Sequence, residues 1–303
     1  MLTRALATIL LLLPLPAAWG QAKVNRVINL WKEGIPAIGH GVVDFSFDQA
    51  TQWSRSEYDF LFVDHEHRPL NFGELRFFLQ ALLDRGQILT QGDRLMKPVP
   101  FLRIPGEGRE SNTWMIKQAL DIGAPAVIVP RVSTAAQALN AVRGARYPQT
   151  PSSRHPKPDG FRGASPDIAV RYWGVTMPEY FRMADTWPLN PEGEVILTIQ
   201  IEDREGMANL DEILKVPGIG MVLIGPLDLS FALGHPGDRD HPEVEAGIQQ
   251  IFRKVKAAGI SCGIVTAANR ALERARQGFK WISVGGELDP AVIRQARQEG
   301  KGK

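Results

Sequence analysis

Eight short apolar runs, separated by longer amphipathic stretches, constrain the fold more than any other feature of this sequence. Most of the runs are continuously apolar rather than alternating, as expected for parallel strands that are covered on both faces. From Pro36 onward they occupy residues 37–43, 59–63, 99–104, 126–129, 195–201, 221–224, 261–265 and 281–284.

The stretches between these runs have the period of helices. Residues 242–258 carry an apolar stripe, with Pro242 at the start and Gly259 just past the end. Residues 113–122 form a second helix closed by Gly123, and Ser133 is expected to cap a third. Eight strands alternating with helices predict a single (β/α)8 TIM barrel, with a doubly wound open sheet as the alternative.

The first twenty residues differ from the rest of the chain. Arg4 precedes an apolar run over residues 5–18, and the small-x-small pattern Ala18-Trp19-Gly20 follows. These are the parts of a secretory signal peptide, and the run is short for a membrane span. We therefore expect an exported, periplasmic protein with a signal peptide at 1–20, a barrel domain at 21–303 and no stable membrane insertion after cleavage. An uncleaved N-terminal anchor is the alternative.

The charge and the cysteine content limit the classes of function that this chain can have. The formal net charge is +2, and the basic residues are spread along the chain, so nothing favours a nucleic-acid or membrane-surface partner. The single cysteine, Cys262, cannot form an internal disulfide. Its apolar surroundings favour a small buried residue over a catalytic thiol.

Residues 147–194 break the alternation. This segment is rich in proline and polar residues, with a helix-like piece at 178–184. Long loops in compact domains are uncommon and often functional. We expect a long βα loop on the active-site face of the barrel.

Polar residues that follow the apolar runs are the first candidates for chemistry, because active sites of such barrels lie at the carboxyl ends of the strands. Glu202 and Asp228 follow neighbouring strands, and two carboxylates suit a hard octahedral ion such as Mg²⁺ or Mn²⁺. A surface ion pair or a helix cap is the alternative for either residue. Arg103 offers a permanent charge and a planar fork of donors for a carboxylate or an enolate.

His67 and Asp121 are candidates for proton transfer. A histidine titrates near neutrality, which suits a general base. Asp121 lies near the end of a helix, where its charge needs a partner. We do not expect a zinc site made by His65 and His67.

Seven segments, in order, resemble motifs of one known family. The chain is similar to the HpcH/HpaI aldolases, metal-dependent class II pyruvate aldolases such as 4-hydroxy-2-oxoheptanedioate aldolase, over about residues 29–298. The segments are FVDHEH at 62–67, PFLR at 100–103, LDIGA at 120–124, ARYP at 145–148, IQIE at 199–202, GPLDLS at 225–230 and LGHPG at 233–237.

The resemblance implies a fold and a set of roles. The fold would be a TIM barrel of the phosphoenolpyruvate/pyruvate-binding type. The reaction would be cleavage of a 4-hydroxy-2-oxo acid to pyruvate and an aldehyde through a metal-stabilised enolate, in a homohexamer built as a trimer of dimers. The implied roles are metal binding by Glu202 and Asp228 (Mg²⁺ or Mn²⁺, with Co²⁺ a further option), substrate binding by Arg103, Gln200, Gly225 and Pro226, and catalysis by His67, Arg103 and Asp121, the last reaching the site from a neighbouring subunit.

Three features depart from the family pattern and leave the aldehyde open. His65 and His40 stand where other residue types are common, and the 147–194 segment is long. Two other functions remain as alternatives. One is a related lyase such as an oxaloacetate decarboxylase, with a CoA-thioester lyase less favoured. The other is an exported binding protein for oxo acids that has no catalytic activity.

Overall fold

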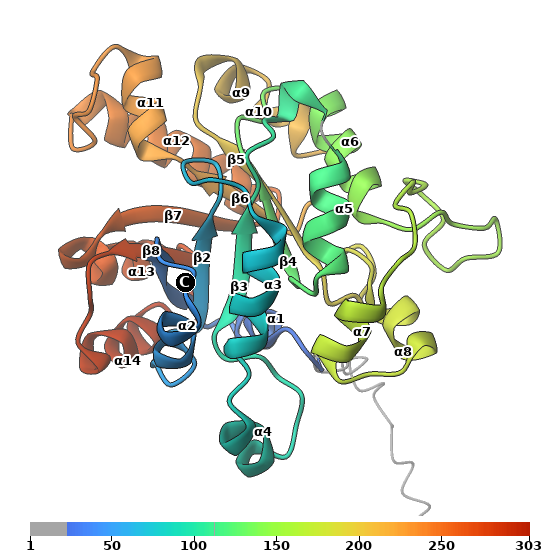
Figure 1. Ribbon diagram of the computed structural model, residues 1–303. Helices are drawn as coiled ribbons and strands as arrows, with labels where there is room; N and C mark the ends of the chain where they lie inside the picture. Colours follow the sequence, from blue (N-terminus) through green and yellow to red (C-terminus); the bar gives the residue numbers. More distant parts are fainter. Residues whose placement is uncertain (1–22, 112) are drawn as a thin grey trace, which may run out of the picture.

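Eight parallel strands close into one barrel in sequence order in the computed structural model, which describes residues 23–111 and 113–303 (Figure 1). Pairing of the first strand with the eighth completes the barrel and rules out the open sheet. Each predicted run forms a strand, with ends within two residues of the expected ones. The strands are β1 (Ala37–Val42), β2 (Phe60–Asp64), β3 (Val99–Arg103), β4 (Ala126–Val129), β5 (Ile196–Ile201), β6 (Met221–Ile224), β7 (Ser261–Ala267) and β8 (Trp281–Gly285).

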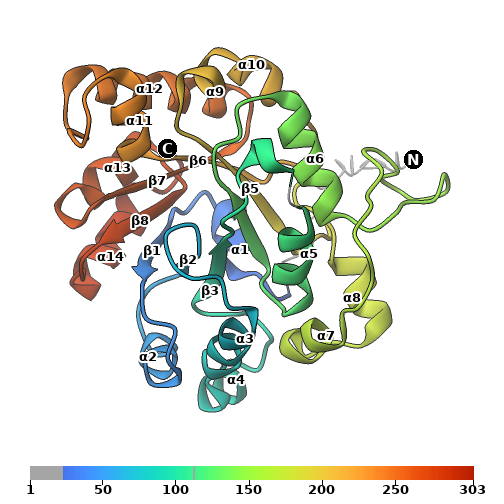
Figure 2. The ribbon, with the colours of Figure 1, turned by 45° about the horizontal axis from the view of Figure 1, so that its top comes forward.

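Helices surround this barrel (Figure 2). The predicted helices at 113–122 and 242–258 are confirmed as α5 and α12. The helices are α1 (Arg26–Lys32), α2 (Phe47–Trp53), α3 (Phe72–Ala81), α4 (Arg85–Gln91), α5 (Thr113–Asp121), α6 (Ala135–Ala145), α7 (Asp167–Trp173), α8 (Met177–Met183), α9 (Arg204–Ala208), α10 (Leu210–Ile213), α11 (Pro226–Leu233), α12 (Pro242–Ala257), α13 (Ala271–Gln277) and α14 (Pro290–Glu299), with short 3-10 turns η1 (Gly108–Glu110) and η2 (Ala268–Arg270).

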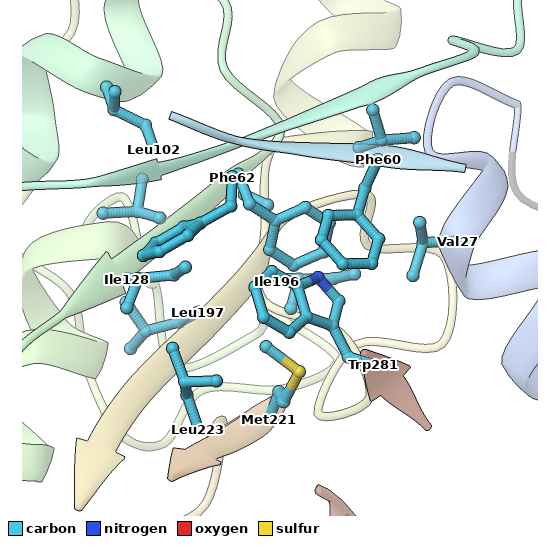
Figure 3. Packing of buried hydrophobic residues seen from close by; sticks show 14 of the residues in the cluster. Val27, Phe60, Phe62, Leu102, Ile128, Ile196, Leu197, Met221, Leu223 and Trp281 are labelled. Atoms are coloured by element: carbon cyan, nitrogen blue, oxygen red, sulfur yellow. The ribbon is translucent and has the colours of Figure 1, made fainter. Parts of the chain in front are cut away.

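Large side chains fill the interior of the barrel. The rings of Phe60 and Trp281 stack with centroids 4.0 Å apart, and Met221 and Leu223 lie beside them (Figure 3). Because side chains alternate along a strand, every second residue of each strand faces this lumen. The interior is therefore a packed core, and only the ends of the barrel can hold a ligand.

Helix α1 is anchored at the amino-terminal end of the barrel. Trp31 Nε1 donates a hydrogen bond to the Lys280 carbonyl at 2.7 Å, directly before β8. Val27, from the same helix, is buried and belongs to the cluster that contains Phe60 and Trp281 (Figure 3). The opposite end, where the strands finish, carries the loops that can form a site.

Two local expectations were wrong. Thr134, not Ser133, caps α6, in a reciprocal capping box with Gln137. The Ser133 hydroxyl instead donates to Asp203 at 2.7 Å. The 147–194 segment is not a βα loop on the active-site face: it runs from α6 to β5, so it is an αβ connection at the amino-terminal end of the barrel (Figure 1). It contains α7 as well as the expected α8. Trp173 of α7 is buried and donates its Nε1 hydrogen to the Gly123 carbonyl, so tertiary burial stabilises a helix that has little periodicity of its own.

Other expectations divide between confirmed and untested. Cys262 is buried on β7, and burial raises the pKa of its thiol, so the thiolate is disfavoured. Within residues 23–111 and 113–303, no helix is long and apolar enough to cross a membrane. The expected signal peptide at 1–20 lies outside the described residues.

Candidate active site at the mouth of the barrel

Arg103 ends β3 with its side chain directed into the mouth of the barrel. Asp64, which pairs with it across β2 and β3, accepts two hydrogen bonds of 2.8 Å from Nε and Nη2. Burial works against ionisation of Asp64, but the Arg103 hydrogen bonds and charge outweigh it and hold the pKa of Asp64 below its usual range. This two-point contact fixes the plane of the guanidinium.

The remaining nitrogen of the Arg103 guanidinium, Nη1, points toward Glu66 and Gln200. Nη1 lies 2.7 Å from Glu66 Oε2 and donates to Gln200 Oε1 at 3.4 Å. The roles of Asp64 and Glu66 were missed at the sequence level. The alternation of Asp64 and Glu66 with His65 was the available signal, because residues two apart on an extended chain share a face.

Gln200 connects Arg103 to Glu202. Its amide group donates from Nε2 to Glu202 Oε2 while its oxygen faces Arg103. Gly225, at the end of β6, lets the backbone approach this carboxylate, since a Cβ there would lie 2.1 Å from Glu202 Oε2. Arg103, Gln200, Glu202 and Gly225 are thus brought together as the sequence predicted.

Glu202 is the most perturbed carboxyl of the group. Burial, followed by the charges of Glu66 and Asp228, raises its pKa to about 8. The charges of Glu66 and Asp228 beside Glu202 indicate a place that favours an additional positive charge. Oxygen ligands of this kind fit a hard divalent cation, which Glu202 and Asp228 would hold.

Arg131 contacts both of these carboxylates. Its backbone N–H donates to Glu202 Oε1 at 3.1 Å, and its Nη2 lies 2.5 Å from Asp228 Oδ1. It is one of two non-glycine residues with positive φ in the described chain, at 48°. Such strain is often found at functional sites. Arg131 was not predicted from the sequence, although it lies two residues after the end of β4, where polar residues are candidates for chemistry.

Asp228 lies in the first turn of α11, which directly follows β6. Gly225 is the N-cap and Pro226 the first helical residue. The exposed N–H groups at a helix start attract anions, so this turn can receive a substrate carboxylate. Gly225 and Pro226, which the family resemblance implies as substrate-binding residues, form this helix start.

His67 and Asp121 are not brought together within one chain. The His67 side chain is 57% exposed, and its Nε2 lies 3.8 Å from Glu66 Oε2. Asp121, at the end of α5, forms a 2.8 Å ion pair with Arg162. Burial raises the pKa of Asp121, although Arg162 counteracts this effect. Among the described residues, no hydrogen bond or ion pair joins His67 to Asp121.

His65 and His40 do not line the mouth as expected. His65 is buried, stacks on Phe45 at 4.5 Å, and places Nδ1 3.0 Å from the Pro69 carbonyl. His40 stacks on Trp53 of α2 at 4.8 Å, on the helix-facing side of β1. Both residues alternate with lumen-facing neighbours and therefore point outward. Nothing in the described chain supports a zinc site made by His65 and His67.

A second group of possible metal ligands connects α11 to α12. Ligand atoms of His235, His241 and Glu243 lie within 4.8 Å of one another. The His235 and His241 rings stack nearly parallel at 3.4 Å, and His235 Nε2 is 2.6 Å from Glu243 Oε2. His241 Nδ1 already accepts the Glu243 N–H. Rings stacked face to face direct their nitrogen lone pairs side by side rather than toward one point, which does not suit a shared ion. We therefore interpret these contacts as stabilising the loop between α11 and α12.

Comparison with known proteins agrees with this geometry. Residues 44–292 match the family model described as HpcH/HpaI aldolase/citrate lyase. The chain is 35% identical over 250 residues to the hydroxypyruvate/pyruvate aldolase of Pseudomonas aeruginosa, covering 81% of this chain and 80% of the relative. It is 35% identical over 243 residues to the 2-keto-3-deoxy-L-rhamnonate aldolase of Klebsiella pneumoniae subsp. pneumoniae, covering 80% and 78%.

A solved structure has the same fold. An HpcH/HpaI aldolase/citrate lyase family protein from Burkholderia cenocepacia J2315 aligns with a TM-score of 0.69 and 26% identity, covering 90% of this chain and 96% of that one. The barrel and its charged mouth thus define a carbon–carbon lyase of the divalent-metal-dependent class II aldolases. The chain belongs to the HpcH/HpaI aldolase/citrate lyase family.

Proposed function

We propose that this enzyme cleaves a 4-hydroxy-2-oxo acid to pyruvate and an aldehyde, and catalyses the reverse addition. The observation that carries the proposal is the convergence of Arg103 with Glu202 and Asp228 at one mouth of the barrel, with Gln200 bridging the first two. An enolate needs positive charge preorganised at its oxygen, and this mouth concentrates groups that supply or hold such charge. The name of the Pseudomonas relative, a hydroxypyruvate/pyruvate aldolase, supports pyruvate as the donor, the oxo acid that adds to the aldehyde in the reverse reaction.

Each lining residue has a task in binding pyruvate. Glu202 and Asp228 would hold Mg²⁺ or Mn²⁺, with Co²⁺ as a further option, and the ion would act as a Lewis acid toward the oxo acid. Arg103, whose plane is fixed by Asp64, would direct Nη1 toward the 2-oxo oxygen. Gln200 would line the pyruvate site, and the turn at Gly225 and Pro226 would bind the carboxylate.

Cleavage requires a base for the hydroxyl proton. We assign this proton to His67, directly or through a water molecule, with Asp121 of a neighbouring subunit as its partner. As the proton leaves the C4 hydroxyl, the C3–C4 bond breaks and its electron pair forms the enolate at C2 and C3. Protonation of C3 then gives the methyl group of pyruvate.

Assembly and location complete the proposal. Within one chain, Asp121 pairs with Arg162 and His67 lies beside Glu66, so the two residues do not contact each other. They can act together if subunits meet at the mouth of the barrel, as in a hexamer built from dimers. The sequence of residues 1–20 supports export to the periplasm, after which the barrel acts as a separate soluble domain.

Deuterium exchange into the methyl group of pyruvate, followed by NMR, tests the proposal without knowledge of the aldehyde. We expect exchange with Mn²⁺ or Mg²⁺, loss of exchange after chelation, and loss in Glu202→Ala and Arg103→Ala. Circular dichroism of each variant confirms folding.

Two other outcomes would redirect the assignment. Release of CO2 from oxaloacetate with no turnover of any aldehyde would identify a decarboxylase. Binding of pyruvate and metal by folded protein, with no exchange under any divalent ion, would refute the aldolase and indicate a binding protein.

A further inference from the structure

The mouth of the barrel has two unlike halves. On one side, β2, β3 and β5 finish with lumen-facing Asp64, Arg103 and Gln200. On the other, β7, β8 and β1 finish with the lumen-facing residues Ala267, Gly285 and Gly41. The residues that face the lumen follow from side-chain alternation along each strand and from the register between strands. Trp281 stacks on Phe60 inside the barrel, and Ser283 and Gly285 follow it at intervals of two (Figure 3).

Gly41 has the same orientation. A Cβ on Gly39 would lie 2.3 Å from the Phe60 ring, so Gly39 faces the interior, and Gly41 follows two residues later. The pairing of His40 with Val284 places Gly41 beside Gly285 on adjoining strands. The two glycines thus form one continuous wall of the mouth, opposite the charged half.

Both glycines leave open space. A Cβ added to Gly41 or to Gly285 would meet nothing within 4 Å, whereas one on Gly225 in the charged half would clash with Glu202. Neither Gly41 nor Gly285 has a positive φ, so the backbone does not require glycine at either position. Glycine weakens a strand and often marks close approach of a ligand.

A buried hydroxyl lies in the layer beneath this wall. Ser283 pairs with Gly39 and Val265, faces the lumen and is 1% exposed. Its Oγ has no hydrogen-bond partner among the described residues. Buried polar atoms normally have a partner, so this unpaired hydroxyl indicates a ligand atom or water that completes it. Every lumen-facing side chain that β1, β7 and β8 contribute in the described chain is uncharged.

We propose that the space beside Gly41 and Gly285 is a compartment for an uncharged, hydroxylated substituent on the carbon that forms the new bond, and that these glycines set the largest substrate turned over. This inference rests on the proposed aldolase function. The donor is held at the charged half, so whatever extends from its C3 is directed toward the opposite wall. That substituent belongs either to the donor, as in a C3-substituted pyruvate, or to the aldehyde.

The test narrows the compartment without touching the charged half. Valine is compatible with a strand, and its Cβ at position 41 would meet nothing within 4 Å, so folding of Gly41→Val should be preserved. Exchange of the pyruvate methyl protons should change little, because pyruvate carries nothing beyond its methyl group. In contrast, kcat/KM with glyceraldehyde should fall at least about tenfold relative to formaldehyde, both with pyruvate as donor.

Two further comparisons identify the substituent. Exchange at C3 of 2-oxobutanoate and hydroxypyruvate, without aldehyde, reports on the donor. A Gly41→Val effect there assigns the compartment to the donor substituent, and an effect confined to the aldehyde series assigns it to the acceptor. Ser283→Ala should lower the preference for glycolaldehyde over the isosteric propanal by about tenfold.

Gly163→Val is the matched control, since Gly163 is exposed, lacks a positive φ and would place a Cβ 3.7 Å from the flexible Lys117 side chain. Equal losses with formaldehyde and glyceraldehyde in Gly41→Val, or no size effect in either series, would overturn the compartment while exchange still supports the aldolase. Absence of exchange in the unmodified protein would instead overturn the proposed function, and the compartment with it.

Discussion

Two arginines at the mouth contact four carboxylates. Arg103 donates from Nε and Nη2 to the two oxygens of Asp64, and its Nη1 pairs with Glu66. Arg131 contacts Asp228 at 2.5 Å and Glu107 at 3.3 Å. The contact with Asp64 orients the Arg103 guanidinium toward the site. The contact with Asp228 places the Arg131 guanidinium on a residue that we assign to metal binding, so Arg131 and the metal ion compete for Asp228.

Arg131→Met should therefore strengthen metal binding. Removing a positive charge 2.5 Å from a ligand oxygen frees Asp228 and lowers repulsion of the ion, while the backbone N–H to Glu202 remains. Because both side chains are partly exposed, this repulsion is screened nearly as in water, where about 1 kcal/mol at about 4 Å gives a roughly fivefold lower dissociation constant. Calorimetric titration with Mn²⁺ at fixed pH measures it.

Arg109→Met serves as the control for Arg131→Met, because Arg109 pairs only with the neighbouring Glu107 and is well exposed. Unchanged or weaker Mn²⁺ binding in Arg131→Met, with the control at the wild-type value, would show that Arg131 supports Asp228 rather than competing for it.

Arg103→Lys should nearly abolish enolate formation although charge is conserved. A lysine ammonium cannot form the two parallel bonds to Asp64 and still direct a donor toward Gln200. Loss of one preorganised donor at a developing oxyanion lowers the rate by about 10²–10³. The rate of pyruvate methyl exchange at saturating Mn²⁺ reports the loss. A rate within threefold of wild type would exclude Arg103 from the charge-stabilising role.

The sequence identified residue types at strand ends but not their pairings. Arg103, Glu202 and Asp228 were found because they lie at or just after the ends of apolar runs, and Gln200 was found through the family resemblance. Asp64 and Glu66 were seen without a role, and Arg131 was missed. Their roles depend on the register of β2 against β3 and on side-chain torsions, which no local pattern encodes. The outward direction of His40 and His65 followed from alternation and was predictable.

At the scale of elements, prediction succeeded where burial repeats at a fixed period. All eight strands and α12 carry such a pattern. Helix α7 does not, because it is seven residues long and depends on the buried contact of Trp173 with the Gly123 carbonyl. Short helices gain their stability from tertiary packing rather than from propensity, so their sequences give little signal.

One ion pair between elements should make stability depend on pH. Glu245 of α12 accepts bonds of 2.6 and 2.7 Å from Arg274 of α13. Burial opposes ionisation, but Arg274 and Gln249 outweigh it and lower the pKa of Glu245 to about 2. The unfolded chain therefore takes up the proton first. The stabilisation is complete above the usual glutamate pKa of 4.5 and is lost as pH falls toward 2.

Urea unfolding of wild type and Glu245→Gln between pH 7 and pH 3 measures this effect. The variant should be less stable at pH 7, and the difference should shrink steadily below about pH 5. Glu212→Gln, in an exposed pair with Lys215, is a control that should show little difference at any pH. A constant difference across the range would show that the pair stabilises through packing rather than charge.

At the scale of the whole molecule, the apolar runs predicted the closed barrel, whereas the hexamer is implied by the family resemblance alone and stays a prediction. The barrel follows from eight runs that each need a covered neighbour. The partner of Asp121 does not follow from one chain, because Asp121 pairs with Arg162 and His67 Nε2 lies 3.8 Å from Glu66 Oε2. If both residues act on one substrate, a second copy of the chain must supply one of them.

Mixing two inactive variants distinguishes an active site shared between subunits from one formed by a single chain. His67→Ala and Asp121→Ala should each lose aldol cleavage. Unfolding and refolding them together gives mixed oligomers. If His67 of one subunit works with Asp121 of another, random mixing restores one intact combination in about a quarter of the sites, and activity should recover to about that fraction. If both residues act within one chain, every site remains defective and no activity returns. Recovery that depends on mixing, with none in either variant refolded alone, would place the catalytic site at the interface and make the oligomer the smallest active unit.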